Sequence, residues 1–101
     1  MTAYYILTHT VTDTERYRNE YIPGTWPILT KHQGEIVAVS LQAEVLHGDP
    51  PQGIIIVRFP SADVVREFVN DPEYAPLKQI RLQTTTDSSA VMVPGFTMPG
   101  T

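Results

Sequence analysis

The chain has 101 residues, a length that fits one domain able to bury roughly 60–70% of the surface of its unfolded chain. Its net charge of −4, with only 7 Lys and Arg residues, argues against nucleic-acid or anionic-membrane binding and favours small molecules or proteins as partners. The absence of Cys excludes disulfides, thiolate metal sites and Cys nucleophiles. Because no run of about 18 apolar residues and no signal-peptide pattern occurs, we expect a soluble, cytoplasmic protein without a membrane span.

The first predicted element is a strand over Ala3–Val11, a segment rich in aromatic and β-branched residues. Thr12 and Glu15 follow it with the spacing of a capping box, in which a hydroxyl and a carboxylate satisfy the first free backbone amides of a helix. This pattern predicts that a helix begins at Asp13.

The predicted first helix contains the pair Pro23 and Gly24 about one third of the way along. Proline removes a backbone donor and glycine favours a break, so we expect a kink or an interruption there. Thr25 could then cap a continuation that begins near Pro27 and ends before Gly34.

Two further strands are predicted in the middle of the chain. Glu35–Val45 alternates weakly and is typical of a long strand, and His47–Gln52 has the Gly, Asp and Pro content of a hairpin loop. The next strand, Ile54–Phe59, is apolar at almost every position, which predicts a central strand covered on both faces.

The last third of the chain predicts two helices and a strand. Ser61 is placed to cap a helix directly after the central strand. Asp71 and Pro72 are typical of the cap and the first position of a further helix, which we expect to run to about Gln83. Ala90–Val93 is predicted as a short last strand.

The predicted order β-α-β-β-α-β is that of the ferredoxin-like α+β fold, with a four-stranded antiparallel sheet and both helices on one face. We expect one domain over residues 1–101, with residues 94–101 as a C-terminal tail. The strands are apolar on both faces, so the face without helices needs a cover. A second copy of the chain is the commonest cover, which predicts a homodimer.

Motifs along nearly the whole chain resemble the domain-of-unknown-function 1330 family: Val11-Thr12-Asp13, Lys31-His32, Glu44-Val45-Leu46, Phe59-Pro60-Ser61, Asp71-Pro72-Glu73-Tyr74 and Pro94-Gly95. The resemblance implies a dimeric α+β barrel, a superfamily that includes cofactor-independent monooxygenases, lactone isomerases, haem enzymes and stress-response proteins. The chain departs from the family where two glycines usually follow the position of His32, because Gln33 stands there. It also lacks the family's basic residue near Ser40.

The three histidines lack the spacing of a metal site, so we expect no metal. His9 shares a strand face with Tyr5 and Leu7 and is the candidate catalytic acid or base, the alternative being a hydrogen-bonded residue at a strand end. His32 is expected to cap a helix C-terminus, and His47 to lie on a surface loop.

Two arginines are candidates for holding a ligand oxyanion. Arg58 interrupts the apolar central strand, and a buried guanidinium there would need an anionic ligand or an ion pair with Glu35, Glu44 or the partner subunit. Arg81 lies in the last predicted helix, where the alternative is a solvated position.

The aromatic residues could line a flat pocket between the first helix and the sheet, although each alone is equally typical of a core. Tyr5, Trp26 and Tyr74 are the candidate ligand-binding members, and Tyr17 and Tyr21 complete the set. No catalytic triad, phosphate loop or paired-carboxylate spacing is present in the sequence.

The sequence therefore favours a dimeric protein that binds or transforms a small organic molecule without a cofactor, by isomerase, cyclase or monooxygenase chemistry. The alternative is a non-catalytic structural or stress-associated homodimer whose Arg and His side chains are all internally paired. A haem or flavin enzyme is a third interpretation, disfavoured because no His lies in an apolar helix. An unfilled polar cavity would discriminate between the first two.

Overall fold

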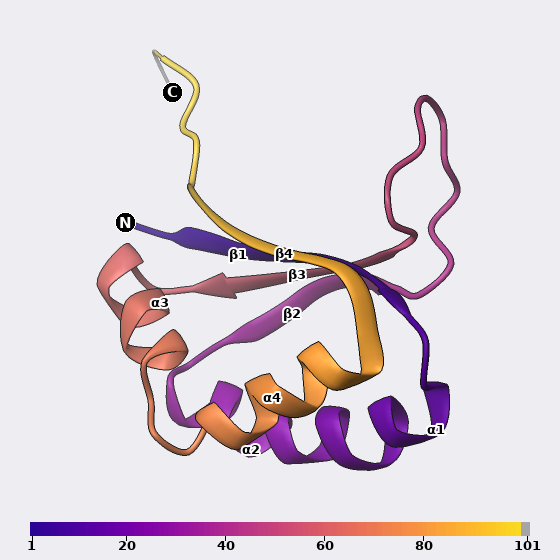
Figure 1. The fold of residues 1–101 in the computed structure, drawn as a ribbon. Coiled ribbons are helices and arrows are strands. Elements are labelled where there is room, and N and C mark those ends of the chain that lie inside the picture. The colour runs from indigo at the N-terminus through magenta and orange to yellow at the C-terminus, as the bar shows by residue number, and fades with distance from the viewer. Residues whose placement is uncertain (100–101) are drawn as a thin grey trace.

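The computed structural model describes residues 1–99 as one antiparallel sheet with helices against one of its faces (Figure 1). The strands are β1 (Ala3–Val11), β2 (Glu35–Ser40), β3 (Gly53–Phe59) and β4 (Thr85–Pro94). Their order in the sheet is β2-β3-β1-β4, and all neighbours are antiparallel. The predicted ferredoxin-like α+β fold is confirmed.

The helical segments are α1 (Thr14–Arg16), the π-helical η1 (Tyr17–Tyr21), α2 (Ile22–Lys31), α3 (Ala62–Val69) and α4 (Ala75–Thr84). All of them lie beneath the same face of the sheet, whereas the loop after β2 and the tail after β4 rise on the opposite side (Figure 1). No helix within residues 1–99 is long and apolar enough to cross a membrane.

The first helix begins at Thr14, one residue later than predicted. Asp13 caps it, because its carboxylate accepts a hydrogen bond from the Arg16 amide at 3.2 Å. The prediction that Thr12 forms a capping box with Glu15 is wrong: the Thr12 amide instead donates to the Thr84 carbonyl at 2.8 Å, which ties the start of the helix to the end of α4.

The predicted break at Pro23 and Gly24 does not occur, because the chain is helical without interruption from α1 through α2. The irregularity lies one turn earlier, where the Ile22 amide donates to the Tyr17 carbonyl in a π turn. A proline ring clashes with the carbonyl four residues before it, and a wider turn at that place relieves the clash. Pro23 therefore lies directly after the π turn, inside a continuous helical segment.

Helix α2 ends as predicted before Gly34, in a closure that requires a left-handed residue. Gln33 has a φ of 60°, and the Gly34 amide donates to the Leu29 carbonyl at 2.7 Å. A side chain at Gly34 would place its Cβ 2.9 Å from the Phe59 ring. Because its φ is positive, Gln33 occupies a backbone conformation whose free-energy cost would be lower for glycine, by about 1 kcal/mol.

Three other element boundaries differ from the prediction. Strand β2 ends at Ser40 rather than Val45, because the Ser40 hydroxyl accepts from the Gln42 amide and turns the chain out of the sheet. Helix α4 begins at Ala75 because Asp71 first forms a side-chain turn with the Glu73 amide at 2.9 Å. Strand β4 is longer than predicted, since the whole of β1 offers it hydrogen-bond partners.

Ser61 caps α3 as predicted, with its hydroxyl accepting from the Val64 amide at 3.3 Å. The short connection from β3 lays α3 back on the sheet, where Phe68 packs edge-on against Tyr5 and face-tilted against Phe59. Alternate residues of β1 and β3 point into this core between helices and sheet: Ala3, Tyr5, Leu7, Val57 and Phe59.

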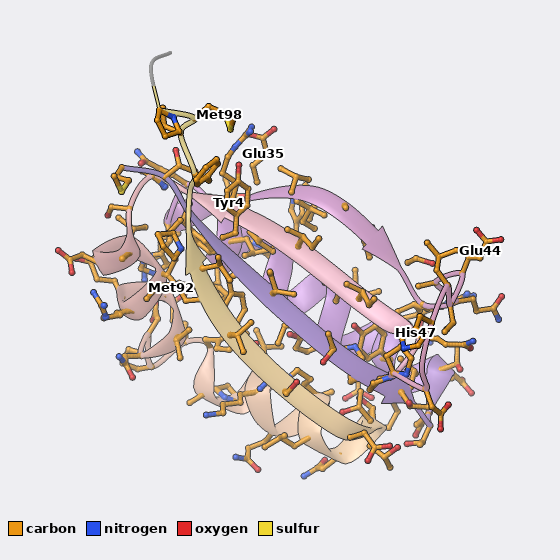
Figure 2. The ribbon with its side chains drawn as sticks, turned by 90° about the horizontal axis from the view of Figure 1, so that it is seen from above. Tyr4, Glu35, Glu44, His47, Met92 and Met98 are labelled. Atoms are coloured by element: carbon orange, nitrogen blue, oxygen red, sulfur yellow. The ribbon has the colours of Figure 1, made fainter. Side chains whose placement is uncertain are left out.

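The opposite face of the sheet has no helix in front of it, as Figure 2 shows from above. One row of side chains crosses all four strands there through paired positions and is entirely apolar: Ala38, Ile56, Ile6 and Val91. The neighbouring rows contain polar groups, such as the Thr8 hydroxyl hydrogen-bonded to Ser89 at 2.8 Å. An apolar stripe with polar flanks is the pattern of a packed interface with a solvated rim.

We predict that this face joins two copies of the chain. Sedimentation at micromolar concentration should give a two-chain species, and Ile6→Lys should shift it to monomer, because a charge at the centre of the stripe would be buried without a partner. Leu82→Lys, at an exposed apolar position on α4, is the matched control and should remain dimeric. A wild-type monomer under these conditions would contradict the prediction.

Candidate functional site

A cavity of about 350 Å³ lies between the first helical segment and strands β1, β2 and β3, and we call it the aromatic cavity. Its walls are almost entirely apolar, and its polar atoms come mainly from tyrosine and threonine hydroxyls. The lining residues are Tyr5, Leu7, Tyr17, Tyr21, Ile22, Thr25, Trp26, Leu29, Ile36, Val39, Ser40, Leu41, Ile55, Val57, Phe68 and Tyr74.

Local structure explains how the aromatic side chains reach this cavity. Tyr17 and Tyr21 stand four residues apart on the inward side of η1, with ring centroids 5.1 Å apart. The Tyr21 hydroxyl lies 2.9 Å from that of Tyr74, which ties the helix to the start of α4. Trp26 is 58% exposed, and so it stands where the cavity meets solvent.

The Thr25 hydroxyl is a second polar feature of the aromatic cavity. This residue is 7% exposed, and its Oγ1 lies near the Tyr21 hydroxyl but forms no hydrogen bond of ordinary geometry in the part of the chain that the structure describes. Buried hydroxyls normally have partners, so an unpartnered one on a cavity wall marks a place for a ligand oxygen or a water molecule.

His9 is fully buried beside Tyr17, with its Nε2 2.9 Å from the tyrosine hydroxyl. Its Nδ1 has no partner among residues 1–99. Burial of a bare acceptor costs less than burial of an unpaired N–H, so we assign the hydrogen to Nε2, which donates to Tyr17. In this tautomer the Tyr17 O–H has no acceptor within the described residues.

Both members of this pair are neutral near pH 7. Burial, with a contribution from the positive charge of Arg81, lowers the pKa of His9 to about 4. Burial also raises the pKa of the Tyr17 phenol well above its usual value. Transfer of a proton from Tyr17 to His9 would oppose both shifts, so the two groups share a hydrogen bond in which each stays neutral.

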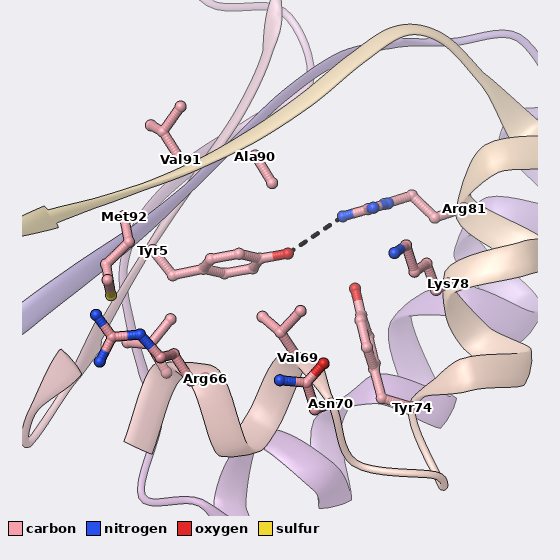
Figure 3. A pocket seen from close by; sticks show the side chains of 11 residues that line it. Tyr5, Arg66, Val69, Asn70, Tyr74, Lys78, Arg81, Ala90, Val91 and Met92 are labelled. Carbon is pink, nitrogen blue, oxygen red and sulfur yellow. Dashed lines mark hydrogen bonds between the residues drawn. The ribbon is translucent and has the colours of Figure 1, made fainter. Parts of the chain in front are cut away.

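Arg81 is 5% exposed, so the alternative that it is solvated is wrong. It borders a second cavity of about 260 Å³ between α3, α4 and β4 (Figure 3), where its Nη1 donates to the Tyr5 hydroxyl at 3.3 Å. Tyr5 and Tyr74 line both cavities and separate them. Arg81 forms no ion pair with a carboxylate in residues 1–99.

Arg58 lies on the opposite face of the sheet, paired with Tyr4 of β1, and lines neither of these cavities. Its side chain is 43% exposed and forms an ion pair with Glu35 at 2.7 Å, which confirms the ion-pair alternative. The assumption that it is deeply buried is wrong, because β3 sends even-numbered side chains to the face without helices.

The other two histidines have structural surroundings. His32 ends α2 as expected, and its Nε2 lies 2.7 Å from an Asp71 oxygen that Lys31 also contacts. His47 is exposed in the loop after β2. No group of three or more His, Asp or Glu side chains within residues 1–99 is arranged to hold a metal ion.

The structure thus brings together three of the six candidate residues, Tyr5, Trp26 and Tyr74, in the aromatic cavity. Arg81 joins two of them in the second cavity, whereas His9 and Arg58 reach neither. Sequence reasoning missed Thr25 as a wall residue and Lys78 near Arg81, since helical spacing alone does not tell which polar side chain borders a void.

The fold and the cavity beneath the sheet define an α+β protein of the ferredoxin-like type. The chain belongs to the family described as domain of unknown function (DUF1330), whose model matches residues 2–96. The search of curated proteins finds no match.

Solved structures with the same fold share little sequence with this chain. A protein of unknown function from Rhodopseudomonas palustris has a TM-score of 0.79 at 16% identity, covering 96% of this chain and 84% of its own. SnoaB, a cofactor-independent oxygenase from Streptomyces nogalater, has a TM-score of 0.69 at 14% identity, covering 99% and 98%. A dimeric protein of unknown function from Bacteroides fragilis has a TM-score of 0.53 at 12% identity, covering 93% and 96%.

The lowered pKa of His9 predicts a specific pH dependence of stability. The unfolded state takes up a proton on this residue near its ordinary pKa of 6.5 and the folded state only near 4, so stability falls as the pH drops between these values. The loss at pH 5 should be about 2 kcal/mol. Asp71, whose pKa the His32 hydrogen bond holds well below its usual range, contributes only at lower pH.

Denaturant unfolding at pH 7 and pH 5, at one protein concentration, measures this effect. His9→Gln keeps a hydrogen-bonding group beside Tyr17 but cannot titrate, so its stability should change less between the two pH values. An equal pH dependence in the variant and the wild type would contradict the assignment to His9.

Proposed function

We propose that this protein binds a flat, largely apolar organic molecule that carries an oxygen acceptor, such as a cyclic ketone, in the aromatic cavity. The observation that carries the proposal is a cavity of about 350 Å³ with aromatic walls and very few polar atoms. Pockets of this size and composition suit small organic ligands, whose orientation a few placed hydroxyls can fix.

The hydroxyls of Tyr17 and Thr25 supply that orientation. Thr25 Oγ1 is buried without a partner, and the Tyr17 O–H is left free when His9 donates to its oxygen. Both groups donate to an acceptor, which favours a carbonyl oxygen over a second hydrogen-bond donor on the ligand. His9 then acts through Tyr17, by fixing the direction of its O–H.

Unsatisfied polar groups weigh against the alternative of a purely structural homodimer. That alternative requires every Arg and His to be internally paired, as Arg58 with Glu35 and His32 with Asp71 are. Arg81 lacks a carboxylate, and His9 Nδ1 and Thr25 Oγ1 lack any partner in residues 1–99. The homodimer and the cytoplasmic location remain part of the proposal, with the apolar stripe and the absence of Cys as their support.

A reaction at this site would rest on hydrogen bonding to developing negative charge rather than on a protein base. Tyr17 and His9 are both neutral and share one hydrogen bond, so the pair can donate a hydrogen bond to a ligand carbonyl oxygen on which negative charge develops. The fold of a cofactor-independent oxygenase, which this chain shares at 14% identity, is compatible with chemistry that the organic substrate itself supplies.

Filling the aromatic cavity should weaken ligand binding. Ile36→Phe adds a ring to its wall, and 1-tetralone, a flat bicyclic ketone, serves as the probe. Trp26 is the only tryptophan, so its single indole N–H resonance reports occupancy in an NMR titration. We expect a saturable shift in the wild type and affinity at least about tenfold weaker in Ile36→Phe, since overpacking costs about 1–3 kcal/mol.

Leu82→Phe is the matched control, because it makes a similar change at an exposed position on α4 and should leave binding unchanged. The proposal fails if wild-type protein shows no saturable shift up to the solubility of 1-tetralone, or if both variants weaken binding equally.

Removal of the two hydroxyls tests the polar part of the proposal. Thr25→Val and Tyr17→Phe should each weaken the affinity for 1-tetralone by about three- to tenfold, because each removes one hydrogen bond. The affinity for the hydrocarbon tetralin should stay unchanged. Thr30→Val, an exposed position on the same helix, is the control. An unchanged ratio of ketone to hydrocarbon affinity in both variants would show that neither hydroxyl contacts the ligand.

A further inference from the structure

The second cavity, between α3, α4 and β4, is lined by three cations and no carboxylate, and we call it the cationic cavity. Figure 3 shows Lys78 and Arg81 together at one end of it and Arg66 at the other. Arg66 has a partner outside the cavity, since it forms an ion pair with Asp63 at 2.9 Å. The uncompensated positive charge therefore lies at the end formed by α4.

Arg81 is the unusual residue of this cavity. It is 5% exposed and permanently charged, yet its side chain makes a single hydrogen bond within residues 1–99, to the Tyr5 hydroxyl. Its Nε is buried without a partner. Lys78, one turn earlier in α4, forms no ion pair within the described residues either.

A buried guanidinium normally has a carboxylate partner, because desolvation of an unpaired charge costs several kcal/mol. The contrast within this chain is direct, since the exposed Arg16 and Arg58 both have such partners and the buried Arg81 has none. The fold thus holds a desolvated cation beside an open space, and an anion in that space would supply the missing charge.

We propose that the cationic cavity binds a small organic carboxylate, with its anionic group between Arg81 and Lys78. A carboxylate matches the planar guanidinium, whose N–H groups are largely without acceptors, and the ammonium of Lys78 adds a second donor. The apolar wall from Val69, Ala90 and Met92 accommodates the hydrocarbon part of the molecule. This site is separate from the proposed ketone site, although Tyr5 and Tyr74 border both.

Calorimetric titration of the full chain with benzoate, against benzamide as the uncharged analogue, tests the proposal. Wild-type protein should bind benzoate saturably and benzamide at least about tenfold more weakly, as expected for loss of a charge-assisted hydrogen bond. Lys78 is exposed, so the variant Lys78→Gln should fold normally. Its affinity for benzoate should be about two- to fivefold weaker than that of the wild type. Arg81→Gln should abolish detectable binding.

Arg18→Gln removes the same charge from an exposed position that lies outside the cationic cavity, and should leave benzoate affinity unchanged. Equal binding of benzoate and benzamide, or equal weakening by Arg18→Gln and Lys78→Gln, would overturn the site. Tighter binding of inorganic phosphate than of benzoate would overturn the carboxylate assignment. If Arg81→Gln does not fold, the benzoate affinities of Lys78→Gln and Lys78→Glu test the proposal instead. The charge reversal in Lys78→Glu should weaken the affinity more than Lys78→Gln does.

The ketone site can be scored independently in the same proteins. Binding of 1-tetralone should persist in Lys78→Gln, and binding of benzoate should persist in Ile36→Phe, because the substituted side chains border different cavities. Failure of one site therefore leaves the other testable.

Discussion

The interior of this protein depends on one desolvated charge, the guanidinium of Arg81 under the sheet. No carboxylate in residues 1–99 neutralises it, and its one hydrogen-bond acceptor among these residues is the Tyr5 phenol at 3.3 Å. Its field also favours the neutral imidazole of His9, which is one cause of the lowered pKa there. Neutral, hydrogen-bonded aromatic rings therefore lie beside this fixed cation, and two of them, Tyr5 and Tyr74, line both cavities.

Alternation along β1 keeps this polar layer of rings apart from the sheet face that has no helices. Tyr5 and His9 point toward the helices, while Ile6, between them in position, lies in the apolar stripe on the other side. A one-residue slip would exchange the two sets and bury the stripe against Arg81. The irregularity in its pairing with β4 lies between Thr8 and Thr10, at His9, whose pairing with Gly53 of β3 is regular.

Periodicity made the strands, the capped helix at Ser61 and the uncovered sheet face predictable, because each follows from local sequence. Parity along β3 also places Arg58 on the face without helices, and strand spacing in the sequence predicts this. The burial of Arg81 was not predictable in this way, since it depends on how α4 is placed against β1 and β4. The π turn before Pro23 was hidden for a similar reason: a proline predicts strain in a helix but not where the chain relieves it.

The aromatic cavity persists because hydrogen bonds, in addition to ring packing, set the positions of its tyrosines. At the end of the core near α3, Phe59 and Phe68 touch with centroids 5.4 Å apart and fill their space. Tyr21 and Tyr74 instead meet through their hydroxyls at 2.9 Å, and Tyr17 is held by His9. Collapse of these rings into the void would leave buried hydroxyls unpaired, at a cost of about 1–3 kcal/mol each. The polar layer therefore maintains an empty apolar space that a purely hydrophobic core would have closed.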